Sequence, residues 1–420
     1  MNSDRGREVM SNPVFILGGY QTDFARHATR ESLEIPDLMF ESINGALAST
    51  GVDARQIAVG HVGNFVGELF TGQGMLGGFY GHAHETLAGI PVSRHEGACA
   101  SGSLAVLAAM ADLESSRYDV ACVTGVELMR NVSGKTASDY LGAAAWVGQE
   151  ATEAQFVWPA MFSQLAEEYD ERYGLKRDHL SEIAKKNFAN ARRNPRAQTR
   201  GWTLTDAHFD EDDELNPVVD GWMRRHDCSQ ISDGAVSVIL ASEEAAKSYC
   251  QQHGRSLHEL AYIAGWGHTT APMRLDTKLS DSRSQRYTLP WTRKAITDAY
   301  QRAGIKDISE IDAIETHDCF TITEYAAIEH FGITDPGNAW QAIEDGRTQL
   351  DGSIPVNPSG GLIGAGHPVG ATGVRMLLDA SRQVTDTAEE IQVLGAKTVA
   401  TFNVGGSGTT NCSFVVSAGN

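Results

Sequence analysis

The chain of 420 residues lacks a disulfide framework, a proline-rich linker and low-complexity tracts. Its six cysteines form no C-x-x-C pair, which excludes the disulfide scaffold of a small secreted protein and fits thiols that stay reduced in the cytoplasm. The twelve prolines mark no boundary between independent modules. We therefore expect one compact, two-lobed body.

Positive charge is also scarce, because 34 lysines and arginines stand against 54 aspartates and glutamates, for a net charge of −20. Such a chain repels nucleic acid and anionic membrane surfaces. No apolar run reaches the length that spans a bilayer. The N-terminal sequence MNSDRGREVMSNP lacks the apolar core of a signal peptide, so we expect a cytoplasmic protein without nucleic-acid or membrane partners.

Cys99 lies in a run of small residues, Gly97 to Ser103, which an apolar stretch from Leu104 to Met110 follows. This pattern predicts a tight turn that becomes a helix, with the cysteine at the helix N-terminus. Unpaired N–H groups and the helix dipole favour a thiolate there. Cys99 is thus a candidate nucleophile, although a free cysteine in such a turn can equally be a packed core residue.

Three later segments carry further candidate groups. The glycine-rich segment 360–373 contains His367 and Pro368 ahead of an apolar helix, 374–380, and proline suits a first helical turn. The alternating segment 311–320 predicts a strand in which His317 and Cys319, two residues apart, point to the same side. The segment 399–408 predicts a strand that enters a glycine turn, whose N–H groups could bind an oxyanion.

The chain repeats one pattern twice. A strand at 57–65, the helix at Cys99 and a strand at 119–126 form one series. A strand at 311–320, the helix at His367 and a strand at 397–404 form the other. We therefore expect Cys99 and His367 at equivalent helix N-termini of two facing halves.

Together these four segments resemble the active-site blocks of the thiolase superfamily, and H-D-C-F at 317–320 resembles its sterol carrier protein type. The resemblance begins at 14–24, which is similar to the family's first strand and turn. It implies an α/β class with a duplicated, five-layer αβαβα fold. The implied divisions are an N-terminal half of 1–126 plus 228–260, a loop domain of 127–227 and a C-terminal half of 261–420. Helical patterning inside the loop domain covers 162–173 and 180–193.

The resemblance also implies acyl transfer between a 3-ketoacyl-CoA and coenzyme A, with CoA as co-substrate and no permanently bound cofactor. Cys99 would be the nucleophile, His367 its base and Cys319 the second acid/base. One oxyanion site would use His317 and His367, and the other the N–H groups of Cys99 and Gly405. Asn403 stands where conventional thiolases have the acid/base cysteine, and an amide cannot exchange a proton at neutral pH.

Contacts to the CoA portion are expected at Ser229, Arg224 and Met161, and further basic candidates are Arg192, Arg193, Arg196, Arg200 and Arg225. Trp158 and Phe162 are candidate pocket residues. A second H-D-C triplet, 226–228, lies in charged surroundings and is interpreted as coincidence. No metal site is expected, because His82 and His84 lack the ligand spacing that is typical of zinc.

Two other functions remain open. Some relatives with this fold act with a small OB-fold partner in acyl transfer or aldol chemistry. A non-catalytic subunit that binds acyl-CoA or lipid would lack the nucleophile, whereas Cys99 is present. The complete set of two cysteines and two histidines favours a thiolase, and the resemblance implies a homodimer or homotetramer.

Overall fold

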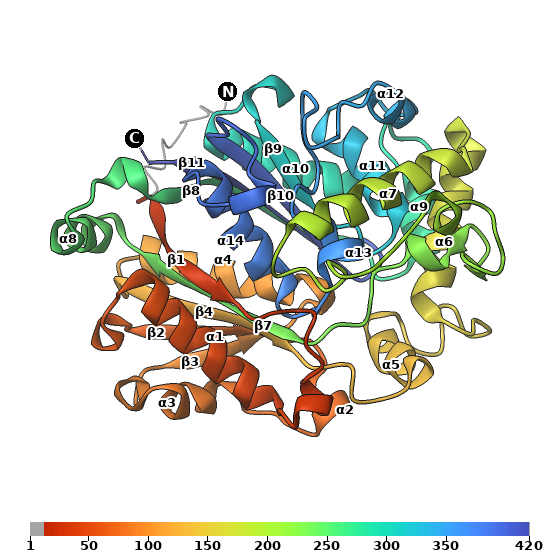
Figure 1. Ribbon diagram of the computed structural model, residues 1–420. Coiled ribbons are helices and arrows are strands. Elements are labelled where there is room, and N and C mark those ends of the chain that lie inside the picture. The colour runs from red at the N-terminus through yellow and green to blue at the C-terminus, as the bar shows by residue number, and fades with distance from the viewer. Residues whose placement is uncertain (1–11, 420) are drawn as a thin grey trace, which may run out of the picture.

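The computed structural model describes residues 12–419. Residues 1–11, most of the N-terminal sequence that was expected to lack a targeting signal, and Asn420 lie outside the described residues. Within the described chain, nine strands form one sheet in the order β3-β2-β4-β7-β1-β8-β11-β10-β9 (Figure 1). Their bounds are β1 Val14–Gln21, β2 Val59–Gly63, β3 Val92–His95, β4 Val120–Glu127, β7 Gly234–Ala241, β8 Ala261–Thr270, β9 Ala313–Thr316, β10 Thr398–Gly405 and β11 Thr410–Ala418.

The sheet is built from two similar halves that meet at β1 and β8. These two strands pair antiparallel, with Val14 opposite Ile263 and Ile16 opposite Ala261. In the first half, β1 pairs antiparallel with β7, β7 pairs antiparallel with β4, and β4 pairs parallel with β2. In the second half, β8 pairs antiparallel with β11, β11 pairs antiparallel with β10, and β10 pairs parallel with β9. A parallel bridge from Ile314 to Val356 repeats the pairing of β2 with β3. The expected duplication is confirmed in this strand order.

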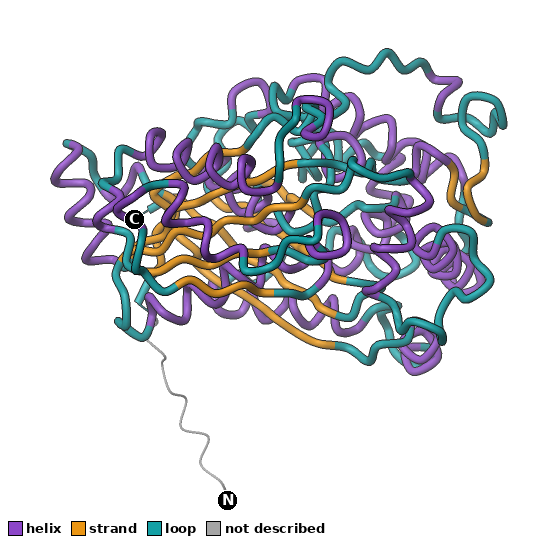
Figure 2. Tube along the Cα trace, turned by 90° about the horizontal axis from the view of Figure 1, so that it is seen from below, coloured by secondary structure: helices purple, strands orange, loops and turns teal. Residues whose placement is uncertain are grey.

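Helices lie on both sides of each half-sheet and between the halves (Figure 2). In the middle, α4 (Ser101–Glu114) packs on α14 (Thr372–Val384) through a shared apolar cluster. On the outside, α1 (Ile35–Thr50) covers the first half and α10 (Pro290–Ala303) covers the second. This gives the five layers expected. The other helices are α2 Gly67–Thr71, α3 Tyr80–Ala83, α8 Glu243–His253, α9 Leu275–Ser282, α11 Thr321–Phe331, α12 Ala339–Glu344 and α13 Gly361–Ala365.

The inserted region contains α5 (Gly134–Leu141), α6 (Val157–Tyr173), α7 (Arg177–Arg193) and a short hairpin of β5 (Val218–Asp220) with β6 (Met223–Arg224). Its helices gather on the right of Figure 1. The two helices predicted inside this region are confirmed in α6 and α7, which begin five and three residues earlier than the patterning indicated.

Close approach of the two central helices depends on glycine. A Cβ on Gly102 in α4 would lie 2.8 Å from the Gly370 carbonyl oxygen and 3.0 Å from the Val374 nitrogen. Both distances are shorter than carbon normally tolerates. Gly102 therefore lets the loop that carries His367 rest directly on the helix that follows Cys99.

Two local predictions were wrong. The strand predicted over 311–320 ends at Thr316, so His317 and Cys319 lie in the loop before α11 and not on a strand. The helix after His367 begins at Thr372, so Pro368 precedes the first turn. The Pro368 carbonyl still accepts the N–H of Thr372, at 3.1 Å, which ties the His367 loop to the start of α14.

Candidate active site

Three loops at the carboxyl ends of strands converge with the loop between α13 and α14, which carries His367. Cys99 occupies the short 3-10 turn Ala98–Ala100, between β3 and α4, and Ala98 has a positive φ of 51°. A non-glycine residue in that conformation is uncommon and strained, a feature that clusters at functional sites. His317 follows β9, and the glycine turn follows β10. The edge where parallel strands end is where α/β sheets commonly bind ligands.

These loops line a cavity of about 650 Å³. Cys99, Cys319 and His367 all contribute to its wall, and so does Ser229. The remaining wall is largely apolar or aromatic and is formed by Phe65, Met129, Leu141, Ala144, Phe156, Trp158, Pro159, Phe162, Val219, Ile231, Phe320 and Val369. Such a lining suits a ligand with a long apolar portion and a few polar groups.

His367 is held as a proton acceptor toward the cavity. Its Nδ1 lies 2.7 Å from the Thr372 hydroxyl oxygen, and that hydroxyl lies 3.2 Å from the Pro368 carbonyl, to which it donates. The hydroxyl therefore accepts the Nδ1 proton, and the lone pair falls on Nε2. That Nε2 is buried without a hydrogen-bond partner among the described residues. It is free to take a proton from a thiol in the cavity.

Thr372→Val should test this orientation, because valine keeps the shape but removes the hydroxyl. We expect kcat to fall about tenfold to a hundredfold, the usual cost of losing a group that orients a functional imidazole. Steady-state kinetics on Thr372→Ser, which keeps the hydroxyl, provides the control. Equal kcat in the valine and serine variants would contradict the role of Thr372.

His317 has the opposite tautomer. Its Nδ1 lies 3.4 Å from the backbone N–H of Val404, which can only donate, and 3.0 Å from the Asn403 amide nitrogen. The proton of neutral His317 therefore lies on Nε2. The Ser103 hydroxyl donates a hydrogen bond to the side-chain oxygen of Asn403 at 2.8 Å, which fixes the orientation of the amide. From the sequence, Asn403 was noted only as a replacement for the acid/base cysteine of conventional thiolases. In the structure its side chain contacts Nδ1 of His317 and positions this imidazole as a hydrogen-bond donor.

The donor atoms of Cys99, His317 and His367 lie within 4.8 Å of one another. One thiol and two imidazoles are also the donor set that zinc takes in proteins. A zinc ligand, however, needs a free lone pair on the coordinating nitrogen. In His317 the backbone N–H of Val404 occupies the lone pair on Nδ1 and leaves Nε2 protonated, so the arrangement suits oxyanion binding better than metal binding.

Burial raises the pKa of Cys99 to about 12, and the nearby Glu127 carboxylate raises it further, while the N–H groups of Cys99 and Gly406 act in the opposite direction. Burial also lowers the pKa of His367 to about 3, with a smaller effect from Arg375. Burial of the thiol therefore opposes the stabilisation of a thiolate that the helix N-terminus would give. Both shifts favour the neutral thiol of Cys99 and the neutral imidazole of His367.

Alkylation with iodoacetamide should reveal this neutral resting state. Only the thiolate reacts, so we expect the rate at Cys99 to rise about tenfold per pH unit from about pH 6 to about pH 9, without a plateau. The modified peptide can be followed by mass spectrometry. A rate that levels off above neutral pH would instead show a preformed thiolate–imidazolium pair.

Cys319 lies between the cavity and a buried polar network. Burial raises the pKa of its thiol well above the ordinary value, and Cys99 and Asp318 act in the same direction, so the thiol stays protonated and able to donate. The neighbouring Asp318 carboxylate accepts the N–H of Leu362 and the Asn187 amide, the latter at 2.8 Å. Asp318 thereby fixes the H-D-C segment against α13 and α7.

Glu127 is a buried acid that sequence reasoning missed. It ends β4, and its oxygens accept N–H groups from Phe65, Val66 and Gly370, at 3.0, 3.3 and 3.1 Å. Burial raises its pKa to about 7. Glu127 therefore ties the loop of His367 to the first half of the fold. The available signal was one acidic residue at the end of an otherwise apolar strand.

The glycine turn after β10 supplies backbone donors. Gly406 lines the cavity, and its N–H acts on the Cys99 thiol, whereas Gly405 ends β10. Gly405 remains a proposed donor, and Gly406 is a candidate that sequence reasoning did not single out. Lys278 in α9 stabilises this turn, because its buried ammonium donates to the hydroxyls of Ser407 and Thr409, each at 2.9 Å.

Two expected CoA contacts lie outside this cavity. The Arg224 guanidinium pairs with Asp213 at 2.8 Å, and Met161 is buried on another face of α6. Their neighbours Arg225 and Phe162 line the cavity instead. Cys228, from the triplet interpreted as coincidence, also lines it. Its backbone pairs with Phe320, an arrangement that no local sequence pattern indicated.

Comparison with known proteins agrees with this architecture. The sequence model described as "Thiolase, N-terminal domain" matches residues 14–244, and the one described as "Thiolase C-terminal domain-like" matches residues 275–418. Within the described residues, no helix combines the length and apolarity needed to cross a membrane.

Curated relatives match over almost the whole chain. An acetyl-CoA acetyltransferase of Methanothermobacter thermautotrophicus is 32% identical over 94% of this chain and 97% of its own length. Sterol carrier protein 2 of Gallus gallus is 29% identical over 94% of this chain and 70% of its own length. A solved structure, the "Ltp2-ChsH2(DUF35) aldolase", shares the fold with a TM-score of 0.75 and 21% identity, over 98% of this chain and 99% of its own. The chain belongs to the thiolase family and is an acyltransferase of the thiolase type.

Proposed function

We propose that the protein cleaves a 3-ketoacyl-CoA with coenzyme A to give acyl-CoA and acetyl-CoA, or runs the reverse Claisen condensation, through an acyl group on Cys99. One observation carries this proposal: two thiols, Cys99 and Cys319, line the same cavity as an imidazole with a free Nε2. A nucleophile, an acid/base and oxyanion donors are what cleavage next to a thioester requires. All six cysteines of the chain are free thiols, which fits a reducing compartment such as the cytoplasm.

In the first half-reaction, the Cys99 sulfur attacks the 3-keto carbon while its proton passes to Nε2 of His367. The N–H groups of Cys99 and Gly405 or Gly406 hold the resulting oxyanion. When the carbon–carbon bond breaks, the electron pair forms an enolate on the acetyl-CoA portion, and Nε2–H of His317 and of protonated His367 donate to its oxygen. Cys319 then protonates the enolate carbon, which releases acetyl-CoA and leaves an acyl group on Cys99.

In the second half-reaction, coenzyme A replaces acetyl-CoA. The Cys319 thiolate removes the proton from the CoA thiol, and the CoA sulfur attacks the acyl carbonyl on Cys99. The same backbone N–H groups hold the second oxyanion. Collapse of this intermediate releases acyl-CoA, and the Cys99 sulfur recovers its proton from His367, so both thiols return to their starting state.

The CoA portion would enter between the inserted region, 127–227, and the two halves that enclose it. Ser229 lines the cavity next to Cys319, whose carbonyl accepts the Ser229 N–H at 2.8 Å. Arg225 also lines it and forms no ion pair within the described chain, so it replaces Arg224 as the proposed cation for a CoA phosphate. We expect a homodimer or homotetramer, as in other thiolases.

The direct test is thiolysis of acetoacetyl-CoA by the purified chain alone, followed as loss of the substrate's enolate absorbance. We expect CoA-dependent turnover with parallel lines in double-reciprocal plots, which mark a covalent intermediate. A chain that turns over only after addition of an OB-fold partner protein would support the partner-dependent alternative, for which the two-component name of the Ltp2-ChsH2(DUF35) aldolase offers a parallel.

A further inference from the structure

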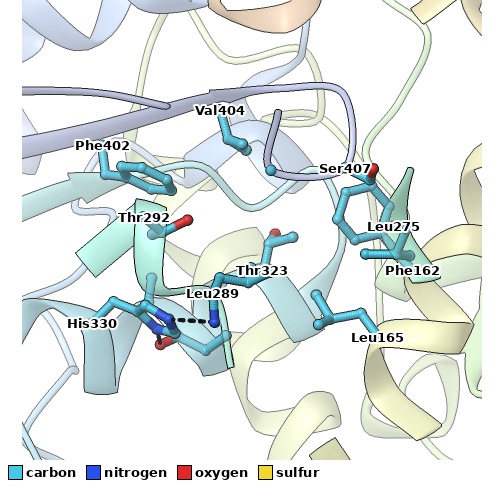
Figure 3. A pocket seen from close by; sticks show the side chains of 13 residues that line it. Phe162, Leu165, Leu275, Leu289, Thr292, Thr323, His330, Phe402, Val404 and Ser407 are labelled. Atoms are coloured by element: carbon cyan, nitrogen blue, oxygen red, sulfur yellow. Dashed lines mark hydrogen bonds between the residues drawn. The ribbon is translucent and has the colours of Figure 1, made fainter. Parts of the chain in front are cut away.

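A second, small space, here called the back cavity, lies between α6 of the inserted region and elements of the C-terminal half (Figure 3). Its volume is about 20 Å³, room for about one water molecule. Phe162 is the one residue among the described linings that borders both this back cavity and the catalytic cavity. The back cavity is otherwise lined by Leu165, Leu275, Leu289, Thr292, Thr323, Ala326, Ala327, His330, Phe402, Val404, Ser407 and Gly408.

One face of α6 leads from the catalytic cavity to the back cavity. Trp158, Phe162 and Leu165 are spaced four and three residues apart, so they share this face. Trp158 borders only the catalytic cavity, Phe162 borders both, and Leu165 borders only the back cavity. The seven steps from Trp158 to Leu165 cover about 10 Å along the helix axis. The Phe162 ring stacks on Phe320, beside Cys319, with ring centres 4.6 Å apart.

The polar groups around the back cavity are already paired with protein partners. His330 donates from Nδ1 to the Ala326 carbonyl, and its Nε2 accepts the N–H of Leu289 at 3.2 Å (Figure 3). Thr323 donates to the Phe320 carbonyl at 2.6 Å, and Thr292 donates to Asn411 at 2.8 Å. Little hydrogen-bonding capacity remains for water, so this space favours hydrocarbon.

We propose that the back cavity is the end of an acyl-chain site and that Phe162 determines acyl-chain length by closing it. This inference rests on the proposed function, because the chain that would enter is the distal hydrocarbon of a 3-ketoacyl-CoA. With the ring in place, the acyl chain stops at the Phe162–Phe320 stack. A shorter side chain at position 162 joins the two cavities and lets a longer chain pass along α6.

The test compares acetoacetyl-CoA with 3-ketododecanoyl-CoA as substrates. In Phe162→Ala and Phe162→Leu we expect the ratio of kcat/KM, long chain over short, to rise about tenfold or more, since a single accommodated methylene changes this quantity by about that factor. Adding Ala326→Leu, which refills the back cavity from α11, should return the ratio toward the wild-type value. Phe188→Leu, in another apolar cluster of the inserted region, is the matched control.

Binding of the saturated products separates this inference from the proposed function. Dodecanoyl-CoA and acetyl-CoA can be titrated by calorimetry whether or not the chain turns over, and Phe162→Ala should favour dodecanoyl-CoA by about tenfold or more relative to wild type. If the wild type is inactive but Phe162→Ala still shows this shift in binding, only the proposed function is contradicted. An unchanged ratio in a folded Phe162→Ala or Phe162→Leu variant, or an equal rise in Phe188→Leu, would overturn the inference.

Discussion

Replacing Cys99 by alanine is expected to lower kcat/KM for thiolysis by about 10⁴-fold or more, because the covalent route disappears with its nucleophile. The fold should persist, since alanine is smaller than cysteine and already occupies positions 98 and 100. Substrate should still bind, because the apolar wall of the cavity is unchanged. Steady-state thiolysis with thermal unfolding alongside measures both quantities.

Cys250→Ala is the control for loss of a thiol elsewhere, because Cys250 is buried in α8 away from the cavity. We expect its kcat/KM to stay within about twofold of wild type, as for sites outside the machinery. Residual activity above a few per cent in Cys99→Ala would show that another group, such as Cys228, carries the acyl transfer.

Cys319→Ala has the second largest expected effect, a fall in kcat of about 10² to 10⁴-fold, the range for loss of a general acid/base. The two half-reactions should respond unequally. Release of CoA as a thiolate needs less help from an acid than protonation of a carbanion does. The variant should therefore still form acetyl-Cys99 from acetyl-CoA, while cleavage of the carbon–carbon bond nearly stops.

Cys319→Ser separates proton transfer from packing. Serine keeps a donor of similar size, but its hydroxyl is a much weaker acid than a thiol, so we expect it to be nearly as slow as alanine. Full activity in either variant would remove Cys319 from the mechanism. The next candidate would then be Cys228, which also lines the cavity.

The sequence predicted those parts of the site that depend on local pattern. Small residues before an apolar helix located Cys99, and the repeated strand–turn–helix order indicated two matching halves whose loops meet. The conformation after β9 was not predictable, because alternation of apolar residues continues past Thr316 although the strand ends there. His317 still faces Cys99, since the backbone N–H of Val404 and the Asn403 amide fix its ring.

Two of the predicted CoA contacts lie one position away from residues that line the cavity. Met161 and Phe162 differ by one position in α6, which is about 100° of helix rotation, and only Phe162 reaches the cavity. Arg224 and Arg225 differ likewise, and the acidic residues that pair Arg224 come from residues 211 and 213. The raised pKa of Cys99 depends on its burial and on Glu127, which the chain brings close only after folding.

The central claim is that the acyl group is carried by Cys99 while Cys319 exchanges protons. The most direct test is to mix the wild-type protein with acetoacetyl-CoA without free CoA, quench it in acid and map the modified peptide by mass spectrometry. We predict one acetyl group on Cys99, formed at least as fast as turnover and removed when CoA is added. Acetylation at Cys319 or Cys228, or turnover without any acylated peptide, would contradict the account.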